Sequence, residues 1–231
     1  MRIMAGATTL GNLAGTLGIP VEEAAIVAEL KAGSEDAYAW LIAQFQQPVY
    51  SLVYRIVSDP ADAADTTQEV FLKVFRGMKR FNGSSSLKTW VYRIAVHEAS
   101  NQKRWWFRHK AREMSIEPEA APDERAFAVR DLLVDGGISP LESLAQQELK
   151  TLVERELRGL DEPFRTTIVL REIEELSYEE IAEVMQTSLG TVKSRITRGR
   201  EALKKRLEPH FRNLELGQFR SSADQKIEVT S

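Results

Sequence analysis

Apolar residues recur every three or four positions along most of this chain, the spacing that places them on one face of an α-helix. The first two periodic segments predict helices over residues 21–32, ended by Gly33, and over residues 35–57, where Pro48 should bend the helix. Residues 1–20 are small, Gly-rich and weakly patterned, and we expect a flexible leader there. The inward side of the second helix is expected to consist of Trp40, Leu41, Phe45, Leu52, Val53 and Ile56.

Two further helices follow, and local signals mark where they begin. Asp59 has the side chain of an N-cap, and Pro60 suits the first helical position because that position needs no amide hydrogen. The next helix starts at Leu87, after a polar loop over residues 82–86, and runs to about Arg104. The expected buried stripes are Val70, Phe71, Val74, Phe75 and Met78 in the first helix, and Leu87, Trp90, Val91, Ile94, Ala95 and Ala99 in the second.

The segment over residues 176–200 has the pattern of a helix-turn-helix. Ser177 and Glu180 have the spacing of a capping box that starts a short helix, and residues 186–188 form the turn. The helix after the turn has an apolar side made of Leu189, Val192, Ile196 and Leu203. Its other side carries side chains that bind phosphates and base edges when a helix enters a major groove, namely Thr191, Lys193, Ser194, Arg195, Thr197, Arg198 and Arg200. Double-stranded DNA is therefore the expected partner.

These elements divide into two groups, which predicts an all-α fold of two small helical domains joined by a flexible linker. The first domain is expected over residues 21–110 and the second over residues 141–212. Residues 111–140 between them are rich in acids, prolines and glycines and cannot bury much surface, so we interpret them as the linker. Residues 213–231 are expected to form a flexible tail.

The formal net charge of −3 over the 231 residues, taken alone, argues against DNA binding. Charge is, however, segregated along the chain. Residues 187–212 contain eight Lys or Arg and two Glu, whereas residues 113–162 contain thirteen acidic and five basic residues. A locally basic helix can bind phosphate while the acidic remainder suppresses indiscriminate binding.

Composition excludes several other classes of protein. The chain has no cysteine and three scattered histidines, so we expect no disulfide, no metal site, no cofactor and a reducing, cytoplasmic location. No segment is apolar for long enough to be a secretory signal or to insert in a membrane. The enzymatic alternative is a hydrolase using Asp62, Asp65 and His97, but these residues form no nucleophile–base arrangement and no phosphate loop accompanies them. We therefore expect no enzymatic activity.

Four stretches, in this order along the chain, resemble the extracytoplasmic-function sigma factors of the bacterial sigma-70 family, which retain regions 2 and 4 of that family. They are DAADTTQEVFLKVFRGMKRF (62–81), SSSLKTWVYRIAVHEASN (84–101), LDEPFRTTIVLREIEELSYEEIAEVM (160–185) and TSLGTVKSRITRGREAL (187–203). The resemblance implies an alternative sigma factor that binds core RNA polymerase and directs initiation at particular promoters. It also implies an anti-sigma factor as a regulatory partner.

The first stretch places carboxylates on one face of a helix, which taken alone is an ordinary solvated face. The resemblance implies instead that this face binds the coiled coil of the polymerase β′ clamp. The core-binding candidates are Asp62, Asp65, Gln68, Glu69 and Phe71. By the same resemblance, the second domain holds the tip of the β flap.

The second stretch combines a polar loop, aromatic residues and a basic helix side, which suits single-stranded DNA. The resemblance implies capture of a base of the promoter's minus-ten element, with Phe81, Asn82, Ser84, Ser85, His97, Asn101 and Arg104 as candidates. From its spacing we expect Trp90 in the core and leave Tyr92 undecided. The aromatic and basic run over residues 104–110 either contacts the DNA backbone or packs on its own domain or a regulator.

In the helix-turn-helix, the resemblance assigns Lys193, Ser194, Thr197 and Arg198 to reading the minus-thirty-five element, with Arg195 and Arg200 on phosphates. Gln186 stands in the turn where Gly is common, and a positive φ there would cost about 1 kcal/mol. The alternative within DNA binding is a free-standing helix-turn-helix regulator that dimerises on a palindrome. That alternative leaves the first domain unexplained.

Overall fold

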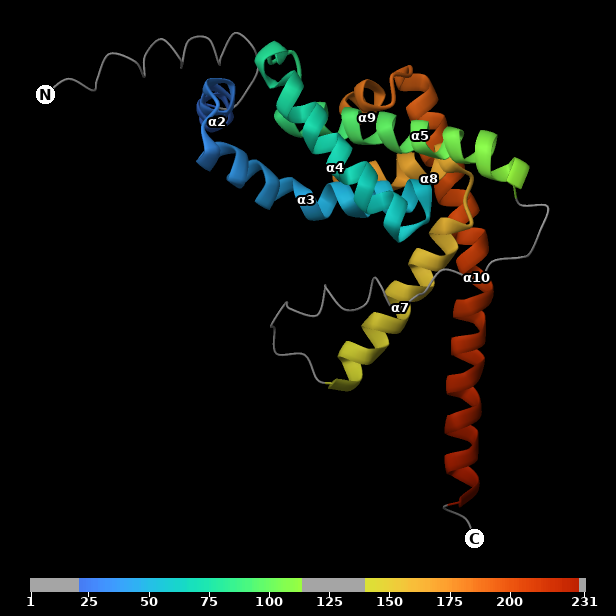
Figure 1. Cartoon of the computed structure of the whole chain (residues 1–231). Helices are drawn as coiled ribbons and strands as arrows, with labels where there is room; N and C mark the ends of the chain where they lie inside the picture. The colour runs from blue at the N-terminus through green and yellow to red at the C-terminus, as the bar shows by residue number, and fades with distance from the viewer. Residues whose placement is uncertain (1–20, 114–139, 229–231) are drawn as a thin grey trace, which may run out of the picture.

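The computed structural model describes residues 21–113 and 140–228, which form helices and short connections with no strand among them (Figure 1). The all-α prediction is confirmed. The leader over residues 1–20 and nearly all of the predicted linker lie outside the described residues. In chain order the elements are α2 (Val21–Ala32), α3 (Glu35–Val57), α4 (Pro60–Gly77), the 3₁₀ turn η1 (Met78–Arg80), α5 (Leu87–Glu113), α7 (Pro140–Arg158), α8 (Glu162–Ile168), the π-helical turn η3 (Val169–Ile173), α9 (Tyr178–Val184) and α10 (Leu189–Glu228).

The helix ends follow local chemistry. Ser34 caps α3 by accepting a hydrogen bond from the amide of Ala37 at 3.3 Å, and Asp59 caps α4 by accepting from the amide of Asp62 at 2.8 Å. Pro60 occupies the start of α4, as predicted. Helix α5 runs beyond Arg104 to Glu113, because the run that follows contains no helix breaker.

In the first module, α2 to α5, the helices α3, α4 and α5 pack against one another around buried residues that include Val49, Leu52, Val70 and Val91. In the second module, α7 to α10, helix α10 packs on α8, α9 and α7. Its helix-turn-helix is built from α9 and the first turns of α10. Helix α10 continues through to Glu228, into the stretch that we predicted as a tail.

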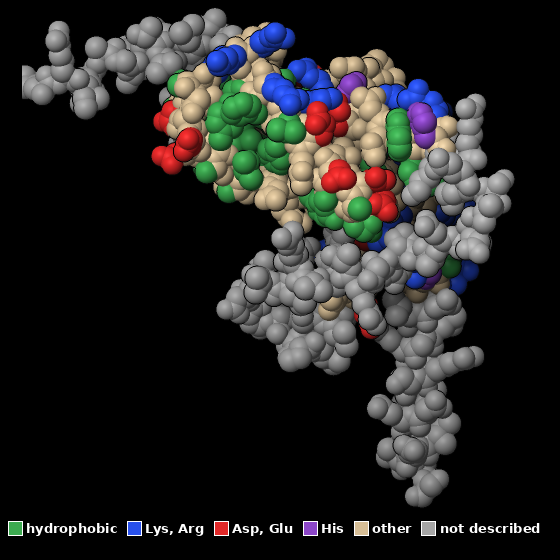
Figure 2. Space-filling view, in the orientation of Figure 1, with side chains coloured by type: hydrophobic (Ala, Val, Ile, Leu, Met, Phe, Trp, Pro, Cys, Tyr) green, Lys and Arg blue, Asp and Glu red, His purple; other side chains and the backbone are tan. Residues whose placement is uncertain are grey.

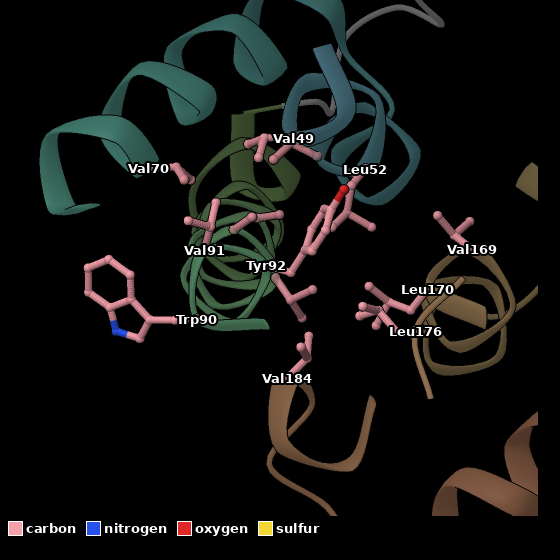
Figure 3. Close-up of a cluster of buried hydrophobic side chains, with 14 of the residues drawn as sticks. Val49, Leu52, Val70, Trp90, Val91, Tyr92, Val169, Leu170, Leu176 and Val184 are labelled. Atoms are coloured by element: carbon pink, nitrogen blue, oxygen red, sulfur yellow. The ribbon is translucent and has the colours of Figure 1, made fainter. Parts of the chain in front are cut away.

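The two modules lie directly against each other. Helix α5 packs on α9, and α3 packs on α8, so buried residues of both modules form one continuous hydrophobic cluster. Figure 3 shows Leu170, Leu176 and Val184 of the second module facing the side of α5 that carries Tyr92. The prediction of two tethered domains did not include this contact.

Two aromatic residues that we predicted to be buried are exposed. In α3, Ala37 and Leu41 lie on the buried face of the helix. Trp40 is rotated about 100° from Leu41 around the helix axis, and its side chain is 42 % exposed. In α4, Phe75 is 60 % exposed beside the fully buried Val74. Both predictions were wrong because the apolar stripes are wider than the surface that neighbouring helices cover. Phe45 and Phe71 are half-buried, and Trp90 is buried as expected.

Candidate functional site

Helix α4 presents a mixed acidic and apolar face to solvent. Asp65 and Gln68 are exposed and Glu69 is half-buried, whereas Asp62 accepts a hydrogen bond from Gln102 of α5 at 3.1 Å. Phe71 packs partly into the core, so only part of its ring is available to a partner. The exposed side chains of Leu72 and Phe75 continue the face that starts at Asp65 and Gln68, one and two turns further on.

Phe75 was missed as a surface residue because it was assigned to the buried stripe of this helix, and Leu72 was assigned neither to that stripe nor to the binding surface. The position of Leu72 and Phe75 relative to Val70 and Val74, which are fully buried, distinguishes these two residues from core residues. Residues 65, 68, 72 and 75 share the opposite face at three- and four-residue steps. Figure 2 shows hydrophobic side chains gathered on the visible face of the first module. The exposed large hydrophobic residues of this module include Trp40, Ile42, Leu72 and Phe75.

A cleft of about 530 Å³ lies between α4 and α5. It brings the predicted core-binding residues Asp65 and Glu69 beside the predicted DNA-binding residue Asn101. The other residues that line it are Thr66, Glu98, Gln102, Trp105 and Arg108. Two surfaces predicted for different partners therefore adjoin.

Glu98 of α5 forms an ion pair across the cleft with a residue of α4. Lys73 of α4 reaches across to its Oε2 at 2.5 Å, and Nδ1 of the neighbouring His97 lies 2.9 Å from its Oε1. Burial opposes ionisation of Glu98, but the hydrogen bonds from Lys73 and His97 outweigh it and lower the pKa of this carboxyl. A fixed negative charge thus lies close to His97.

The predicted minus-ten loop has an ordered geometry. Oδ1 of Asn82 accepts a hydrogen bond from the amide of Ser84 at 3.1 Å, and Gly83 between them has a φ of +73°. Asn82 and Ser84 are exposed, whereas Ser85 is half-buried and its Oγ has no hydrogen-bond partner among the described residues. The loop therefore exposes the side chains of Asn82 and Ser84 and buries Oγ of Ser85.

Phe81 does not belong to this exposed set, and its prediction as a base-contacting residue is corrected. It is 4 % exposed, and its ring packs against Trp90 with 5.0 Å between ring centroids. The resemblance alone nominated Phe81, and in the structure its ring anchors the loop to the core.

The remaining minus-ten candidates form a row along α5. Nδ1 of His97 lies 3.1 Å from Nδ2 of Asn101, and Arg104 donates a hydrogen bond to Oδ1 of Asn101. His97 and Arg104 are exposed and Asn101 is half-buried. One turn further on, Trp105 is 49 % exposed and stacks on His109. A continuous polar and aromatic surface therefore extends along α5 from His97.

The helix-turn-helix is built as the sequence predicts. The amide of Ser177 donates to the carboxylate of Glu180 at 2.8 Å, and the amide of Glu180 donates to Oγ of Ser177 at 3.2 Å, which completes the capping box. Gln186 in the turn has a φ of +49°. Ser188 then caps α10 by accepting from the amide of Thr191 at 3.1 Å.

Helix α10 presents the predicted DNA-binding side chains on the side away from Val192 and Ile196, which are buried. Lys193, Ser194, Thr197 and Arg198 are exposed, and Thr191 and Arg195 are half-buried. Arg200 is exposed but binds Glu172, with its Nη2 2.6 Å and its Nε 2.9 Å from Oε1. The hydrogen bond to Glu172 raises the pKa of Arg200. Arg200 therefore stays charged, and its charge is paired with the carboxylate of Glu172.

The described residues contain no cluster of three His, Asp or Glu side chains that could hold a metal ion. Nor does any helix in this part of the chain combine the length and the apolar character needed to cross a membrane.

Comparison with known proteins covers both modules. Residues 41–112 match the family Sigma-70 region 2, and residues 150–203 match Sigma-70, region 4. The RNA polymerase sigma-H factor of Pseudomonas aeruginosa is 36 % identical over 187 residues, which cover 81 % of this chain and 94 % of that protein. The ECF RNA polymerase sigma-E factor of Escherichia coli is 36 % identical over 187 residues (81 % and 95 %), and the SigW factor of Bacillus subtilis is 32 % identical over 181 residues (78 % and 94 %).

Solved structures share the fold at lower identity. The structure of CnrH in complex with the cytosolic domain of CnrY aligns with a TM-score of 0.55 and 22 % identity, covering 80 % of this chain and 96 % of that chain. The sigma factor RpoE of Bartonella quintana, solved with the anti-sigma factor NepR, aligns with a TM-score of 0.56 and 21 % identity, covering 74 % and 96 %.

Proposed function

The chain belongs to the extracytoplasmic-function sigma factors of the sigma-70 family, and on that premise we propose that it binds core RNA polymerase and directs it to a particular set of promoters. The observation that carries this proposal is that both regions occur in order and that the relatives are matched over 94 % of their length or more. The chain would act in the cytoplasm, with polymerase, and its own residues would perform no covalent chemistry.

In the first step, α4 binds the coiled coil of the β′ clamp. Asp62, Asp65, Gln68 and Glu69 supply charge and hydrogen-bonding groups, and Phe71 contributes the exposed part of its ring. The exposed positions of Leu72 and Phe75 on the same face support adding both to this surface. Apolar anchors surrounded by polar residues are the usual composition of a protein interface, which favours a protein partner over solvent for this face.

In the second step, the loop and α5 hold melted DNA at the minus-ten element. Asn82, Ser84 and Ser85 offer hydrogen bonds to an extruded base, and the row of His97, Asn101 and Arg104 binds adjacent nucleotides. Holding an unstacked base in a site offsets part of the cost of opening the duplex.

In the third step, the N-terminal turns of α10 enter the major groove of the minus-thirty-five element. The exposed side chains of Lys193, Ser194, Thr197 and Arg198 read base edges there, and Thr191, Arg195 and Arg200 bind phosphates. The second module also holds the tip of the polymerase β flap. An anti-sigma factor is a further proposed partner, in keeping with the Bartonella quintana factor that was solved with one.

Two variants test the assignment in the full chain. Arg198→Ala should weaken binding of the reconstituted holoenzyme to minus-thirty-five DNA and keep core binding, whereas Glu69→Lys should do the reverse. Run-off transcription from a randomised promoter pool would then identify the preferred sequence. Equal loss of core binding and of minus-thirty-five binding in a folded variant would contradict the assignment of these activities to separate surfaces. Tight binding of operator-like DNA without polymerase would favour the free-standing regulator instead.

A further inference from the structure

The imidazole of His97 on α5 is held at one of its two nitrogens. Its Nδ1 lies 2.9 Å from Oε1 of Glu98 and 3.1 Å from Nδ2 of Asn101. Its Nε2 makes no hydrogen bond within the described residues, and 59 % of the side chain is exposed. Nε2 is therefore the ring nitrogen available to a ligand. In the neutral ring it offers a lone pair if Nδ1 carries the proton, and a proton if Nδ1 does not.

The two contacts of Nδ1 make opposite demands on that nitrogen. An ionised carboxylate only accepts hydrogen bonds, so the contact with Glu98 requires a proton on Nδ1. The NH₂ group of Asn101 only donates, so the contact with it requires a lone pair on Nδ1. Reversing the amide of Asn101 would remove the conflict, but it would break the hydrogen bond that Oδ1 accepts from Arg104. Only one of the two contacts can therefore be a hydrogen bond at a time.

The contact with Glu98 is the stronger of the two. Burial opposes ionisation of this carboxyl, but the hydrogen bonds from Lys73 and His97 lower its pKa below the ordinary value, so the group stays ionised. A hydrogen bond to an ionised acceptor is about twice as strong as one between neutral groups. The side chain of Glu98 is only 12 % exposed, so water competes little for its oxygens. Nδ1 of the neutral ring therefore carries the proton and donates it to Glu98.

This tautomer determines which bases suit the exposed nitrogen. With the proton on Nδ1, Nε2 is a hydrogen-bond acceptor, and a base must meet it with a donor. At the exocyclic position that faces the major groove, adenine and cytosine carry an amino group, which donates. Guanine and thymine carry a carbonyl oxygen there, which accepts. An acceptor at Nε2 of His97 therefore favours an amino base over a keto base.

We propose that Glu98 is a positioning residue for promoter recognition. Held by Lys73 of α4, Glu98 fixes the tautomer of His97, and Nε2 of His97 then accepts a hydrogen bond from the exocyclic amino group of an adenine or cytosine in the melted minus-ten element. Glu98 itself need not touch the DNA. This inference rests on the proposed function, because it needs polymerase to hold melted promoter DNA beside α5.

The tautomer can be observed directly in the free, full-length chain. Long-range proton–nitrogen NMR correlation spectra of protein with isotope-labelled histidine distinguish a protonated from an unprotonated ring nitrogen, and a pH of about 8.5 favours the neutral ring. The signals of His97, one of three histidines, are identified by their loss in His97→Asn. We expect a protonated Nδ1 and an unprotonated Nε2. The opposite assignment in the natural chain would overturn the inference without recourse to any further variant.

Glu98→Gln should reverse the tautomer. Lys73 only donates, so its ammonium would bind the amide oxygen of the new side chain and leave the amide NH₂ facing Nδ1 of His97, which must then accept. Nε2 would carry the proton and become a donor. The NMR spectrum should show this reversal directly.

The same substitution should change the base that is selected. The reconstituted natural holoenzyme is used to select DNA from a promoter pool randomised over the minus-ten element, and should enrich adenine or cytosine at the position read by His97. Glu98→Gln should shift that preference towards guanine or thymine roughly tenfold. Glu29→Gln, which removes the same charge at an exposed position of α2, is the matched control and should leave the preference unchanged.

A double-variant cycle separates positioning from a structural effect. His97→Asn replaces the ring by an amide that offers both a donor and an acceptor and has no tautomer to fix. The promoter position whose base preference changes in His97→Asn is the one that His97 reads. In that background Glu98→Gln should have no effect on the preference at that position. An equal shift in both backgrounds would show that Glu98 does not act through the imidazole, and would overturn the inference.

The remaining outcomes separate this inference from the proposed function. Failure of the unmodified chain to bind core polymerase would overturn the proposed function, and this inference with it. Normal promoter selection by the natural holoenzyme, combined with an unchanged base preference in a folded Glu98→Gln chain, would overturn only the inference. So would a preference of the natural holoenzyme for guanine or thymine at the position read by His97.

Discussion

The phenolic hydroxyl of Tyr92 in α5 donates a hydrogen bond to the carboxylate of Glu174 in the other module, 82 positions further along the chain. Tyr92 is 1 % exposed and Glu174 is 8 % exposed, so both groups depend on this contact for the hydrogen bonds that water would otherwise supply. The contact also settles the position of Tyr92, which the sequence left undecided. It is a buried residue of the interface between the modules.

Removing that hydroxyl should destabilise the folded chain. Tyr92→Phe keeps the ring but leaves the buried carboxylate of Glu174 without its donor, and we expect the free energy of unfolding to fall by about 1–3 kcal/mol. Urea denaturation followed by circular dichroism measures the change. Tyr38→Phe is the matched control, since it keeps the ring contact with Phe75 and should change the free energy by less than about 0.5 kcal/mol. Equal effects of the two substitutions would contradict the role of the contact.

The same contact predicts a dependence of stability on alkaline pH. Burial first, and then the hydrogen bond and charge of Glu174, raise the pKa of Tyr92 far above its ordinary value. Above about pH 10 the unfolded chain loses this proton while the native protein keeps it, so the stabilising contribution is complete below that pH and declines above it. The difference in unfolding free energy between the natural chain and Tyr92→Phe should therefore shrink from pH 9 towards about pH 11. A constant difference over that range would contradict the raised pKa.

Two glycines of α10 should respond to alanine in opposite directions. A Cβ at Gly199 would lie 2.8 Å from Cγ1 of Ile168 in α8, so Gly199→Ala should cost about 1–3 kcal/mol of stability despite its better helix propensity. Gly190 is exposed, and a Cβ there would meet only Oγ of Ser188 at 3.9 Å. Gly190→Ala should therefore stabilise the protein by about 0.5–1 kcal/mol. Thermal unfolding compares the two, and a stabilised Gly199→Ala would show that α10 does not pack closely on α8.

The sequence predicted those features that depend on neighbouring residues. The caps at Asp59 and Ser177, the end of α2 and the bounds of α3 follow from side chains within one turn of the helix end, and all were confirmed. The packing of α5 on α9 could not be predicted, because its contacts join residues such as Arg93 and Glu183 that are 90 positions apart. Nothing in the local pattern of either segment specifies the other.

The candidate site was predictable to a similar extent. The exposed side of α10 follows from helical spacing alone, since Val192 and Ile196 mark the buried side. Phe81 was nominated by the family resemblance, and the local sequence does not specify that its ring packs on Trp90. Phe75 was assigned to the core for the complementary reason, since exposed apolar anchors and core residues are of the same residue types.

Gln186 offers a test of local strain in the helix-turn-helix. Its φ of +49° lies in the left-handed region, which costs a residue with a side chain about 1 kcal/mol relative to glycine. Gln186→Gly should raise the free energy of unfolding by about 0.5–1 kcal/mol, and Gln186→Asn should fall between the two because asparagine tolerates this region better. Urea denaturation measures both. An unstable glycine variant would mean that the Gln186 side chain contributes more than its backbone strain costs.

Phe75 should matter for binding and not for folding. Because its side chain is 60 % exposed, Phe75→Ala should change the free energy of unfolding by less than about 1 kcal/mol. If the face of α4 that includes Gln68, Leu72 and Phe75 binds the β′ clamp, the same substitution should weaken binding to core polymerase roughly tenfold or more, as the loss of an interface anchor does. Fluorescence anisotropy of the labelled chain titrated with core enzyme measures this affinity.

Phe211→Ala is the matched control for Phe75→Ala, because Phe211 is a comparably exposed aromatic residue on α10, in the other module. It should leave the affinity for core polymerase within about twofold of that of the natural chain, the range of a neutral surface substitution. Full affinity in a stable Phe75→Ala variant would restrict the core-binding surface to the charged residues at the start of α4. A loss of affinity shared by both variants would mean that exposed aromatic area in general, and not this face, contributes to the association.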